Sequence, residues 1–363
     1  MREGGSCNVR ETLHRHTKGR LASRAFEPIL QASWGTLLSV PFAADRFVDT
    51  LRSAFSWNRV LATTFIVASG RELAGFVGWT PAIGYDARLY SAAARAMVEG
   101  ADPWRIALDG GYFAGPPTTL VPFVPFAFLP AVLVSAVWVG LNLALAIRLT
   151  RALRLPSWWI AFPPIFLGIV YGSVEILMIA ILIEGGRWSG LAAVLKPYAV
   201  LPLVAERRWA ALVTGGVVAI VSVLVLPWAM FIANLDLIGG YFGTQGRPLA
   251  NVYGDAALMA VAGAVLLSFG WRRALWLATP VMWPGAQAHY SAMTIKVLPP
   301  VVALCWALPI PEATLLGVGV GAAFELAPAV IRRLPINRDG RWSGRLRHWD
   351  AGEAASSAEA VGG

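Results

Sequence analysis

Long apolar stretches, separated by short clusters of arginine, limit what this chain can fold into more than any other feature. Hydrophobic residues make up 57% of the 363 residues and charged residues only 14%, whereas soluble domains carry about 25% charged residues. The mean hydropathy of +0.60 is typical of a protein that crosses a membrane several times. Because 24 prolines and 36 glycines are spread along the chain, we expect broken helices around a cavity. The predicted fold class is an all-α polytopic membrane protein.

The arginine clusters also indicate what the net charge of +9 means. They flank the apolar stretches, as at Arg148, Arg151 and Arg154, and again at Arg272 and Arg273. Short basic flanks of this kind are typical of cytoplasmic loops and of contact with anionic lipid. We therefore expect a lipid bilayer as the partner, no nucleic acid, and a multi-pass protein of the cell membrane.

The chain is expected to have three parts. Residues 1–57 form a basic head. Within it, residues 1–24 are expected to be disordered, with no apolar segment of a signal peptide, and residues 26–56 to form an amphipathic helix at the membrane interface. Residues 58–331 form the membrane domain, with about 8–11 helices and an external loop at 80–117. Residues 332–363 form a flexible tail that is first basic and then polar.

Within the membrane domain, four prolines from Pro117 to Pro130 predict a short re-entrant or juxtamembrane piece before the next span. The stretch 189–205, interrupted at Lys196 and Pro197, is compatible either with crossing the membrane or with entering and returning. The other apolar stretches predict spans over 58–79, up to Ile147, and over 156–170, 173–183, 209–231, 253–269, 274–288, 291–308 and 313–331.

An isolated carboxylate, Asp86, follows the first apolar stretch. From Asp86 to Gly100, apolar residues recur every three or four positions, which predicts a helix along the outer membrane surface with Asp86 in its first turn. An acid there suits a base for one proton transfer at the boundary between water and lipid. Stabilisation of the first turn by the helix dipole explains the residue type nearly as well, so both interpretations stay open.

Further ionisable residues lie inside apolar stretches, where each destabilises the fold by several kcal/mol without a partner. They are Glu175, Lys196, His289 and Lys296. The spacing of His289 and Lys296 predicts one helix face if 289–308 is helical. Each residue has a structural explanation on its own, such as a lysine that extends to the interface. Together with Asp86 they predict a polar cavity in the outer half of the bilayer.

Several short pieces of sequence occur in an order that is typical of one known family. They are Asp86 after the first apolar stretch, the aromatic-proline run YFAGPPTTLVPFVPFAFLP, the step YGSVE, the segment LKPYAVLPLVAERRW and the late WPGAQAHY. Over roughly residues 58–310, this ordered set resembles glycosyltransferase family 87. The resemblance implies a GT-C fold with a juxtamembrane helix in the first external loop. It also implies an α-mannosyltransferase that uses polyprenyl-phosphate-mannose.

The resemblance assigns roles to three residues. Asp86 matches the family's catalytic aspartate, which implies a general base for the acceptor hydroxyl. His289 matches the family's late histidine and Lys196 its Lys-Pro lysine, which implies that both lie near the lipid phosphate of the donor. The chain departs from the family at the step YGSVE, where members usually carry Gly-Gln followed by Asn or Asp and this chain has Ser173 and Glu175.

The residue types fit one displacement at the anomeric carbon of a sugar. A single carboxylate within hydrogen-bond reach can deprotonate the attacking oxygen, whereas glycosidases need a second carboxylate. A lipid phosphate leaves without a proton from the protein, but its charge must be neutralised. The candidate cations are Arg88, Lys196, Arg247, His289 and Lys296, and the other predicted polar residues of the cavity are Glu175, Tyr290 and Tyr112.

No metal-ligand spacing and no Asp-x-Asp of a nucleotide-sugar enzyme is present in the sequence. We therefore expect no metal cofactor, and the polyprenyl-phosphate sugar is expected as a substrate.

The leading hypothesis is an integral-membrane, inverting glycosyltransferase. It transfers mannose from polyprenyl-phosphate-mannose to a lipid-linked or glycolipid acceptor on the outer side of the cytoplasmic membrane. A transporter or flippase of a polyprenyl-linked sugar would use the same cavity, but it needs two comparable halves and the sequence has no convincing repeat. Two more hypotheses stay open: an arabinosyltransferase with a polyprenyl-phosphate donor, and an inactive relative that assists assembly.

Overall fold

The computed structural model describes residues 57–77, 82–244, 252–284, 286–308, 310 and 312–333. The chain divides into two compact units, Phe42–Glu325 and a second unit formed by Met1–Pro41 with Leu326–Gly363. Of the second unit, only residues 326–333 are described. The predicted disorder of the head, its interfacial helix and the predicted tail beyond 333 therefore lie outside the described residues.

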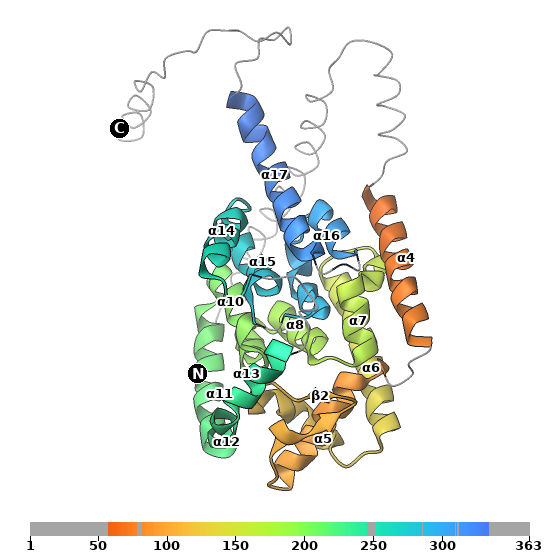
Figure 1. Ribbon diagram of the computed structural model, residues 1–363, viewed down its shortest axis with the longest axis vertical. Coiled ribbons are helices and arrows are strands. Elements are labelled where there is room, and N and C mark those ends of the chain that lie inside the picture. Colours follow the sequence, from red (N-terminus) through yellow and green to blue (C-terminus); the bar gives the residue numbers. More distant parts are fainter. Residues whose placement is uncertain are drawn as a thin grey trace, which may run out of the picture. The chain divides into compact units, whose positions relative to one another are not determined.

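Among the described residues, the regular secondary structure is helical apart from one small antiparallel hairpin (Figure 1). The first half contains α4 (Trp57–Val77), α5 (Tyr85–Val98), η2 (Pro103–Arg105), β1 (Ala107–Leu108), β2 (Gly111–Tyr112), η3 (Pro117–Phe126), α6 (Ala131–Ala152), η4 (Ser157–Ala161), α7 (Pro163–Tyr171) and α8 (Val174–Glu184). The second half contains η5 (Gly186–Ser189), α9 (Gly190–Leu195), η6 (Pro197–Ala199), α10 (Val200–Ala205), α11 (Trp209–Val225), α12 (Trp228–Ala233), α13 (Leu235–Thr244), α14 (Ala256–Leu267), α15 (Trp271–Met282), η7 (Ala288–Lys296), α16 (Pro300–Trp306) and α17 (Ala313–Arg333). The η elements are 3-10 helices.

Prolines divide several predicted spans into shorter helices. In the predicted span 209–231, helix α11 ends early, at Val225. The reason is that Leu226 adopts the extended conformation that a following proline favours. The expectation of one continuous helix over 291–308 is wrong. Here η7 is a 3-10 helix that ends at Lys296, and α16 starts anew at Pro300, with Pro299 as its N-cap.

One described helix, α6, is both long enough and apolar enough to cross a membrane by itself. The pair α7 and α8 would count as a second span, but the two helices meet at a bend of 118°. The apolar segments Trp209–Val225, Ala256–Leu267 and Ala313–Ala327 are shorter. The larger number of spans expected from the sequence stays a prediction.

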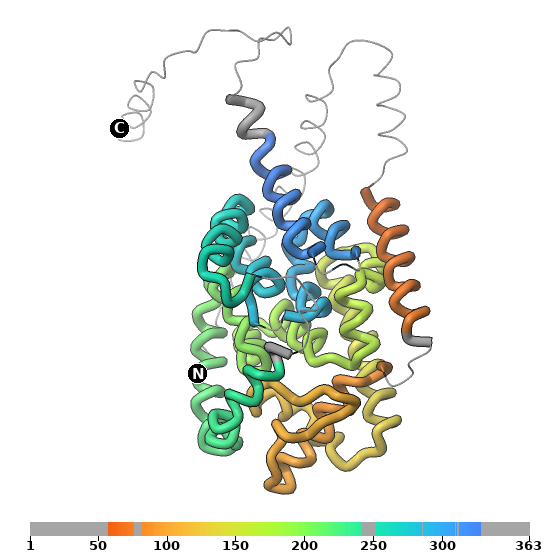
Figure 2. Tube along the Cα trace, viewed as in Figure 1, coloured from red at the N-terminus to blue at the C-terminus, as the bar shows by residue number. Residues whose placement is uncertain are grey.

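Helix α8 joins the two main parts of the core. Its Val174 packs with residues of α5, η3 and α6, including Trp138, while Ile176 and Ile179 pack with the larger cluster around α7, α15 and η7. Figure 2 shows how segments far apart in the sequence meet here: α5 in orange, α7 and α8 in yellow-green, and η7 in blue. Helix α8 therefore supports residues from the first and last parts of the membrane domain at one place.

Helices α9 and α11 cross at a contact that only glycine permits. A Cβ on Gly215 would lie 2.6 Å from the carbonyl oxygen of Gly190, and a Cβ on Gly190 would lie 1.9 Å from the carbonyl oxygen of Ala211. We predict that Gly215→Ala lowers stability by about 1–3 kcal/mol, because the two backbones would have to separate. The measurement is the thermal unfolding midpoint of the purified protein in detergent.

The matched control is Gly216→Ala, one position further along α11, where an added Cβ would meet nothing within 4 Å. Its midpoint should be unchanged or slightly higher, since alanine favours a helix more than glycine does. Equal midpoints for the two variants would contradict the proposed close crossing.

Candidate active site

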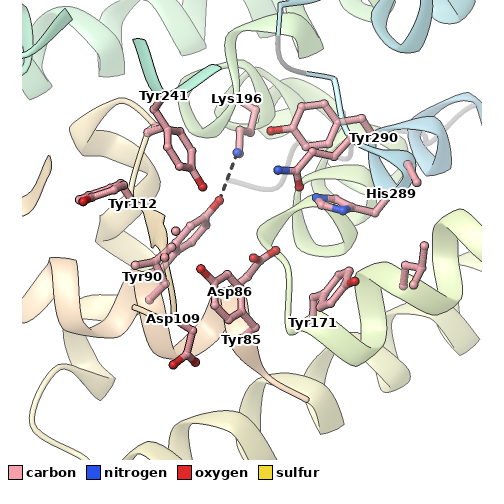
Figure 3. Close-up of a pocket in the computed structure, with 18 residues that line it drawn as sticks. Tyr85, Asp86, Tyr90, Asp109, Tyr112, Tyr171, Lys196, Tyr241, His289 and Tyr290 are labelled. Atoms are coloured by element: carbon pink, nitrogen blue, oxygen red, sulfur yellow. Dashed lines mark hydrogen bonds between the residues drawn. The ribbon is translucent and has the colours of Figure 1, made fainter. Parts of the chain in front are cut away.

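A cavity of about 470 Å³ opens where α5, the hairpin, the end of α7 and the segment before η7 meet. Ligand pockets usually measure about 300–1,000 Å³, so a sugar-sized group fits one of this size. Figure 3 shows its labelled side chains, all of which are tyrosines, aspartates, lysine or histidine. The lining includes Tyr85, Asp86, Tyr90, Asp109, Gly110, Gly111, Tyr112, Tyr171, Lys196, Tyr241, Gln287, His289 and Tyr290.

Two glycines in the left-handed region bring the start of α5 against the end of α7. Gly84, with φ 68°, precedes α5, and its N–H donates to the carbonyl oxygen of Val170 at 2.7 Å. Gly172, also with φ 68°, follows α7, and a Cβ there would lie 2.9 Å from the Cβ of Ala87. A larger side chain at either glycine would be strained; at Gly84 it would also meet Ser135 of α6, and at Gly172 it would push against α5. These two positions therefore keep Asp86 close to the first turn of α8.

Asp86 lies half-buried in the first turn of α5, the place that the sequence predicts. Burial raises the pKa of its carboxyl to about 7; the charge of Glu175 also raises this pKa, and that of Lys196 lowers it. The N-terminus of a helix by itself favours the charged form of an acid. At Asp86 burial outweighs this effect of the helix. A carboxyl with this pKa is suited to accept a proton from a substrate hydroxyl.

Glu175 lies beneath the cavity, at the break between α7 and α8. Ser173 caps α8, and its Oγ accepts a hydrogen bond from the Glu175 N–H at 3.2 Å. The fully buried Asn142 of α6 donates to the carbonyl oxygens of Gly168 and Ser173 at 3.2 and 2.7 Å. These bonds satisfy backbone groups that the break frees. Glu175 is only 1% exposed and does not line the cavity, so it acts there through its charge and through its partners.

Lys196 is the main partner of Glu175. It lies at the break between α9 and η6, because Pro197 ends α9 and gives Lys196 an extended backbone. Its Nζ is 3.1 Å from Oε1 of Glu175 and 3.4 Å from the hydroxyl oxygen of Tyr90. The same Nζ lies 5.7 and 5.4 Å from the ring centroids of Tyr90 and Tyr290. One carboxylate and two aromatic rings thus hold the ammonium group at the cavity wall.

His289 and Tyr290 come from η7, on the opposite side of the cavity from α5 (Figure 3). Nε2 of His289 is 3.7 Å from Oε2 of Glu175, and the histidine is buried. The ring centroids of Tyr171 and Tyr290 are 6.2 and 5.0 Å from that of His289. The histidine is therefore held in place between two tyrosines, with Glu175 as a neighbour that it shares with Lys196.

The structure brings together most of the residues that the sequence analysis selected. Asp86, Tyr112, Lys196, His289 and Tyr290 line the cavity, and Glu175 lies behind Lys196 and His289. These residues come from five segments of the chain that meet around α8.

Lys296 does not belong to this group, which corrects the expectation that it shares a face with His289. Its Nζ pairs with the carboxylate of Glu206 and lies 5.6 Å from the ring centroid of Trp276. The reason is that η7 is a 3-10 helix with three residues per turn, so positions seven apart do not share a face. Arg88 is half-buried on α5 and is not one of the residues that line the cavity. Arg247 lies outside the described residues.

Several lining residues had been given no role from the sequence. They are Tyr85, Tyr90, Asp109, Tyr171 and Tyr241. Asp109 carried a usable signal, because Asp-Gly is a favoured dipeptide for a two-residue hairpin turn. The tyrosines carried none, since an aromatic residue in an apolar stretch packs equally well in many places.

The ligand atoms of Asp86, Glu175 and His289 lie within 4.8 Å of one another, a spacing that could hold a divalent cation. The ammonium group of Lys196 already lies 3.1 Å from Glu175, so such an ion would have to compete with it for this carboxylate. The expectation that no metal is required stays a prediction.

The family model for glycosyltransferase family 87 matches residues 113–331, which is more than half of the chain. The chain belongs to glycosyltransferase family 87. This confirms the resemblance seen in the sequence and identifies the activity as glycosyl transfer. In this family-87 chain, the matched region contains Glu175, Lys196 and His289, whereas Asp86 and the hairpin precede it. No curated protein and no solved structure matches the chain.

The charges around Asp86 predict how its titration responds to substitution. Glu175→Gln removes a negative neighbour and should lower the pKa of Asp86 from about 7, whereas Lys196→Gln removes a positive neighbour and should raise it. The pKa can be measured by infrared titration of the protonated carboxyl band that disappears in Asp86→Asn. Glu184→Gln, at the other end of α8, is the control and should leave the band unchanged. Shifts of the same sign in both cavity variants would contradict this electrostatic arrangement.

Proposed function

We propose that this glycosyltransferase is an integral-membrane, inverting enzyme. It transfers mannose from polyprenyl-phosphate-mannose to a lipid-linked or glycolipid acceptor on the outer side of the cytoplasmic membrane. The observation that carries the proposal is one cavity with a protonatable carboxylate, Asp86, on one wall and a buried cation, Lys196, on another.

Asp86 is the general base in this proposal. As the acceptor oxygen attacks the anomeric carbon, its proton passes to the carboxylate of Asp86, and the bond from the anomeric carbon to the phosphate oxygen breaks. The raised pKa of Asp86 supports this role, because a base with a pKa near the working pH is both deprotonated and able to take a proton. The polyprenyl phosphate leaves with the bonding electrons.

Lys196, with His289 beside it, stabilises the departing phosphate. A phosphate monoester is a weak base, so it needs positive charge and hydrogen-bond donors instead of a general acid. The ammonium group of Lys196 and the hydroxyl groups of Tyr90 and Tyr290 supply these at one wall. Glu175 is 1% exposed and its carboxylate already pairs with Lys196 at 3.1 Å, so we assign it to holding this lysine and not to attack on the anomeric carbon. This supports a single inverting displacement in place of a covalent glycosyl intermediate.

The exposed surface supports a position within the bilayer. Apolar side chains cover the outer face of α11, where Val213, Val217, Ile220 and Leu224 are 66%, 55%, 70% and 82% exposed. Exposed apolar surface of this kind is typical of contact with lipid or with another protein. Together with α6 and the bent pair α7 and α8, it supports a donor and an acceptor delivered through the membrane. The choice of mannose and of the outer face rests on the family resemblance.

The first prediction from this mechanism concerns Asp86→Asn. Transfer should fall by about 10²–10⁴-fold, because the acceptor hydroxyl loses its base while the side chain keeps its shape. The assay follows the sugar from a purified polyprenyl-phosphate-mannose donor into a glycolipid acceptor, alongside the thermal unfolding midpoint.

Asp236→Asn is the matched control, because Asp236 is also an acid in the first turn of a helix, α13, but is not among the cavity residues. It should keep full activity. Wild-type turnover in a folded Asp86→Asn variant would exclude Asp86 as the base and leave stabilisation of the first turn as its role.

The second prediction concerns pH. Since the pKa of Asp86 is raised to about 7, the carboxylate that accepts the proton is the main form above this pH and is lost below it. The ratio kcat/KM should therefore fall about tenfold per pH unit on the acid side of pH 7. The midpoint of this fall in kcat/KM should coincide with the midpoint of the infrared titration of Asp86. A midpoint near pH 4 would mean that another group, or an unperturbed carboxylate, controls the reaction.

A further inference from the structure

The hairpin of β1 and β2 lies at the mouth of the cavity, and its turn has the conformation that its sequence favours. Strands β1 and β2 pair in register, Ala107 with Tyr112 and Leu108 with Gly111, which leaves Asp109 and Gly110 as a two-residue turn. Both turn residues have positive φ, 47° and 84°, as type I′ turns require. Asp109 and Gly110 are exposed and line the cavity.

Two tyrosines from other elements hold this hairpin in place. The hydroxyl of Tyr85, from α5, donates to the carbonyl oxygen of Leu108 at 2.8 Å. A Cβ on Gly111 would lie 1.9 Å from the hydroxyl oxygen of Tyr85 and 3.2 Å from that of Tyr241, so only glycine leaves room for both. The ring of Tyr241, from α13, packs edge-on against Tyr112 with 5.7 Å between centroids. The mouth is therefore fixed before any ligand arrives.

The interior of the cavity holds a cation as well as the carboxylate of Asp86, whereas the described residues of the mouth hold a carboxylate and no cation. Among the described lining residues, Lys196 is the one with a permanent positive charge, and it lies at the wall next to Glu175. Asp109 adds a negative charge at the hairpin, where the other groups are backbone, Tyr112 and Tyr241. An anionic phosphate is attracted to Lys196 and repelled by Asp109. The two ends are therefore suited to different parts of the substrates.

We propose that the hairpin mouth, formed by Asp109, Gly110, Gly111, Tyr112 and Tyr241, binds an uncharged carbohydrate ring of the acceptor. The carboxylate of Asp109 accepts hydrogen bonds from sugar hydroxyls, and the ring of Tyr112, a residue that is 39% exposed, supplies an apolar surface for the face of the sugar. Asp109 is then a specificity-determining residue, since it disfavours an acceptor that carries phosphate on this ring. The inference rests on the proposed function for the identity of the cavity, but its test does not require turnover.

The test is equilibrium binding of octyl α-mannoside and of octyl α-mannoside 6-phosphate to the full chain in lipid nanodiscs. Asp109→Asn should weaken binding of the neutral glycoside by about 3–10-fold, through loss of charge-assisted hydrogen bonds. It should also reduce the preference for the neutral over the phosphorylated glycoside by about tenfold, because the repulsion is removed. Asparagine keeps the turn, since Asn-Gly is a favoured type I′ pair.

Glu99→Gln is the matched control, because Glu99 is an exposed acid at the end of α5 that pairs with Arg95 and is not among the cavity residues. It changes the net charge by the same amount and should leave both affinities as in wild type. Tyr112→Ala tests the apolar surface and should weaken binding of both glycosides, whereas Tyr112→Phe should retain it.

An Asp109→Asn variant with wild-type affinity and wild-type preference would overturn the proposal, as would equal effects of Asp109→Asn and Glu99→Gln. If these binding results are as expected but the wild-type chain transfers no sugar from polyprenyl-phosphate-mannose, the carbohydrate site stands and the proposed function fails.

Discussion

The buried ion pair between Glu175 and Lys196 is the interaction on which the arrangement of the cavity depends. The two charged atoms are 3.1 Å apart, and the side chains are 1% and 8% exposed. Removing one partner of such a pair commonly destabilises a protein by about 3–5 kcal/mol, because the other charge is left buried without compensation. The pair can form only if α7 ends at Gly172 and α9 ends at Lys196. The charge pairing thus selects one relative position for two helix breaks that are more than twenty residues apart.

Helix breaks position residues elsewhere around the cavity as well. Gly84 and Gly172 allow α5 to approach α7, Pro197 places Lys196 in an extended conformation, and η7 presents His289 from a 3-10 helix. Continuous helices would satisfy more backbone groups within each segment, so each break needs outside partners, such as Asn142 for the carbonyl oxygens of Gly168 and Ser173. In return, ionisable residues from distant segments reach one enclosed space, where their mutual effects are stronger than in water.

The electrostatic consequences converge on Asp86. Burial raises the pKa of this carboxyl, Glu175 raises it as well, and Lys196 opposes both. Lys196 thus lies near both the proposed base and the proposed site of the donor phosphate. Binding of phosphate would therefore change the pKa of Asp86. At the mouth, Asp109 has a different setting, exposed on a hairpin that Tyr85 and Tyr241 hold. One cavity therefore contains two carboxylates whose surroundings suit them to different tasks.

How far the sequence leads can be judged from particular residues. The spacing of apolar residues after Asp86 correctly predicted α5 and the place of Asp86 in its first turn, because helical periodicity is a local property. The same reasoning failed for Lys296, because it assumed a helix where prolines and packing produce η7 and a separate α16. The family was also readable from ordered pieces of sequence, and the match to residues 113–331 confirms it.

The sequence by itself determined the apolar, helix-rich character of the chain, the family, and the isolated polar residues that required partners. Only the tertiary structure decided which of them meet: Glu175 with Lys196 and His289, Lys296 with Glu206, and the hairpin with Tyr85 and Tyr241. The physical reason is that the free-energy penalty of a buried charge reveals that a partner must exist, but not where it is. The partner's identity depends on where the helices break and on how closely glycines let them approach, and both are settled by packing across the whole domain.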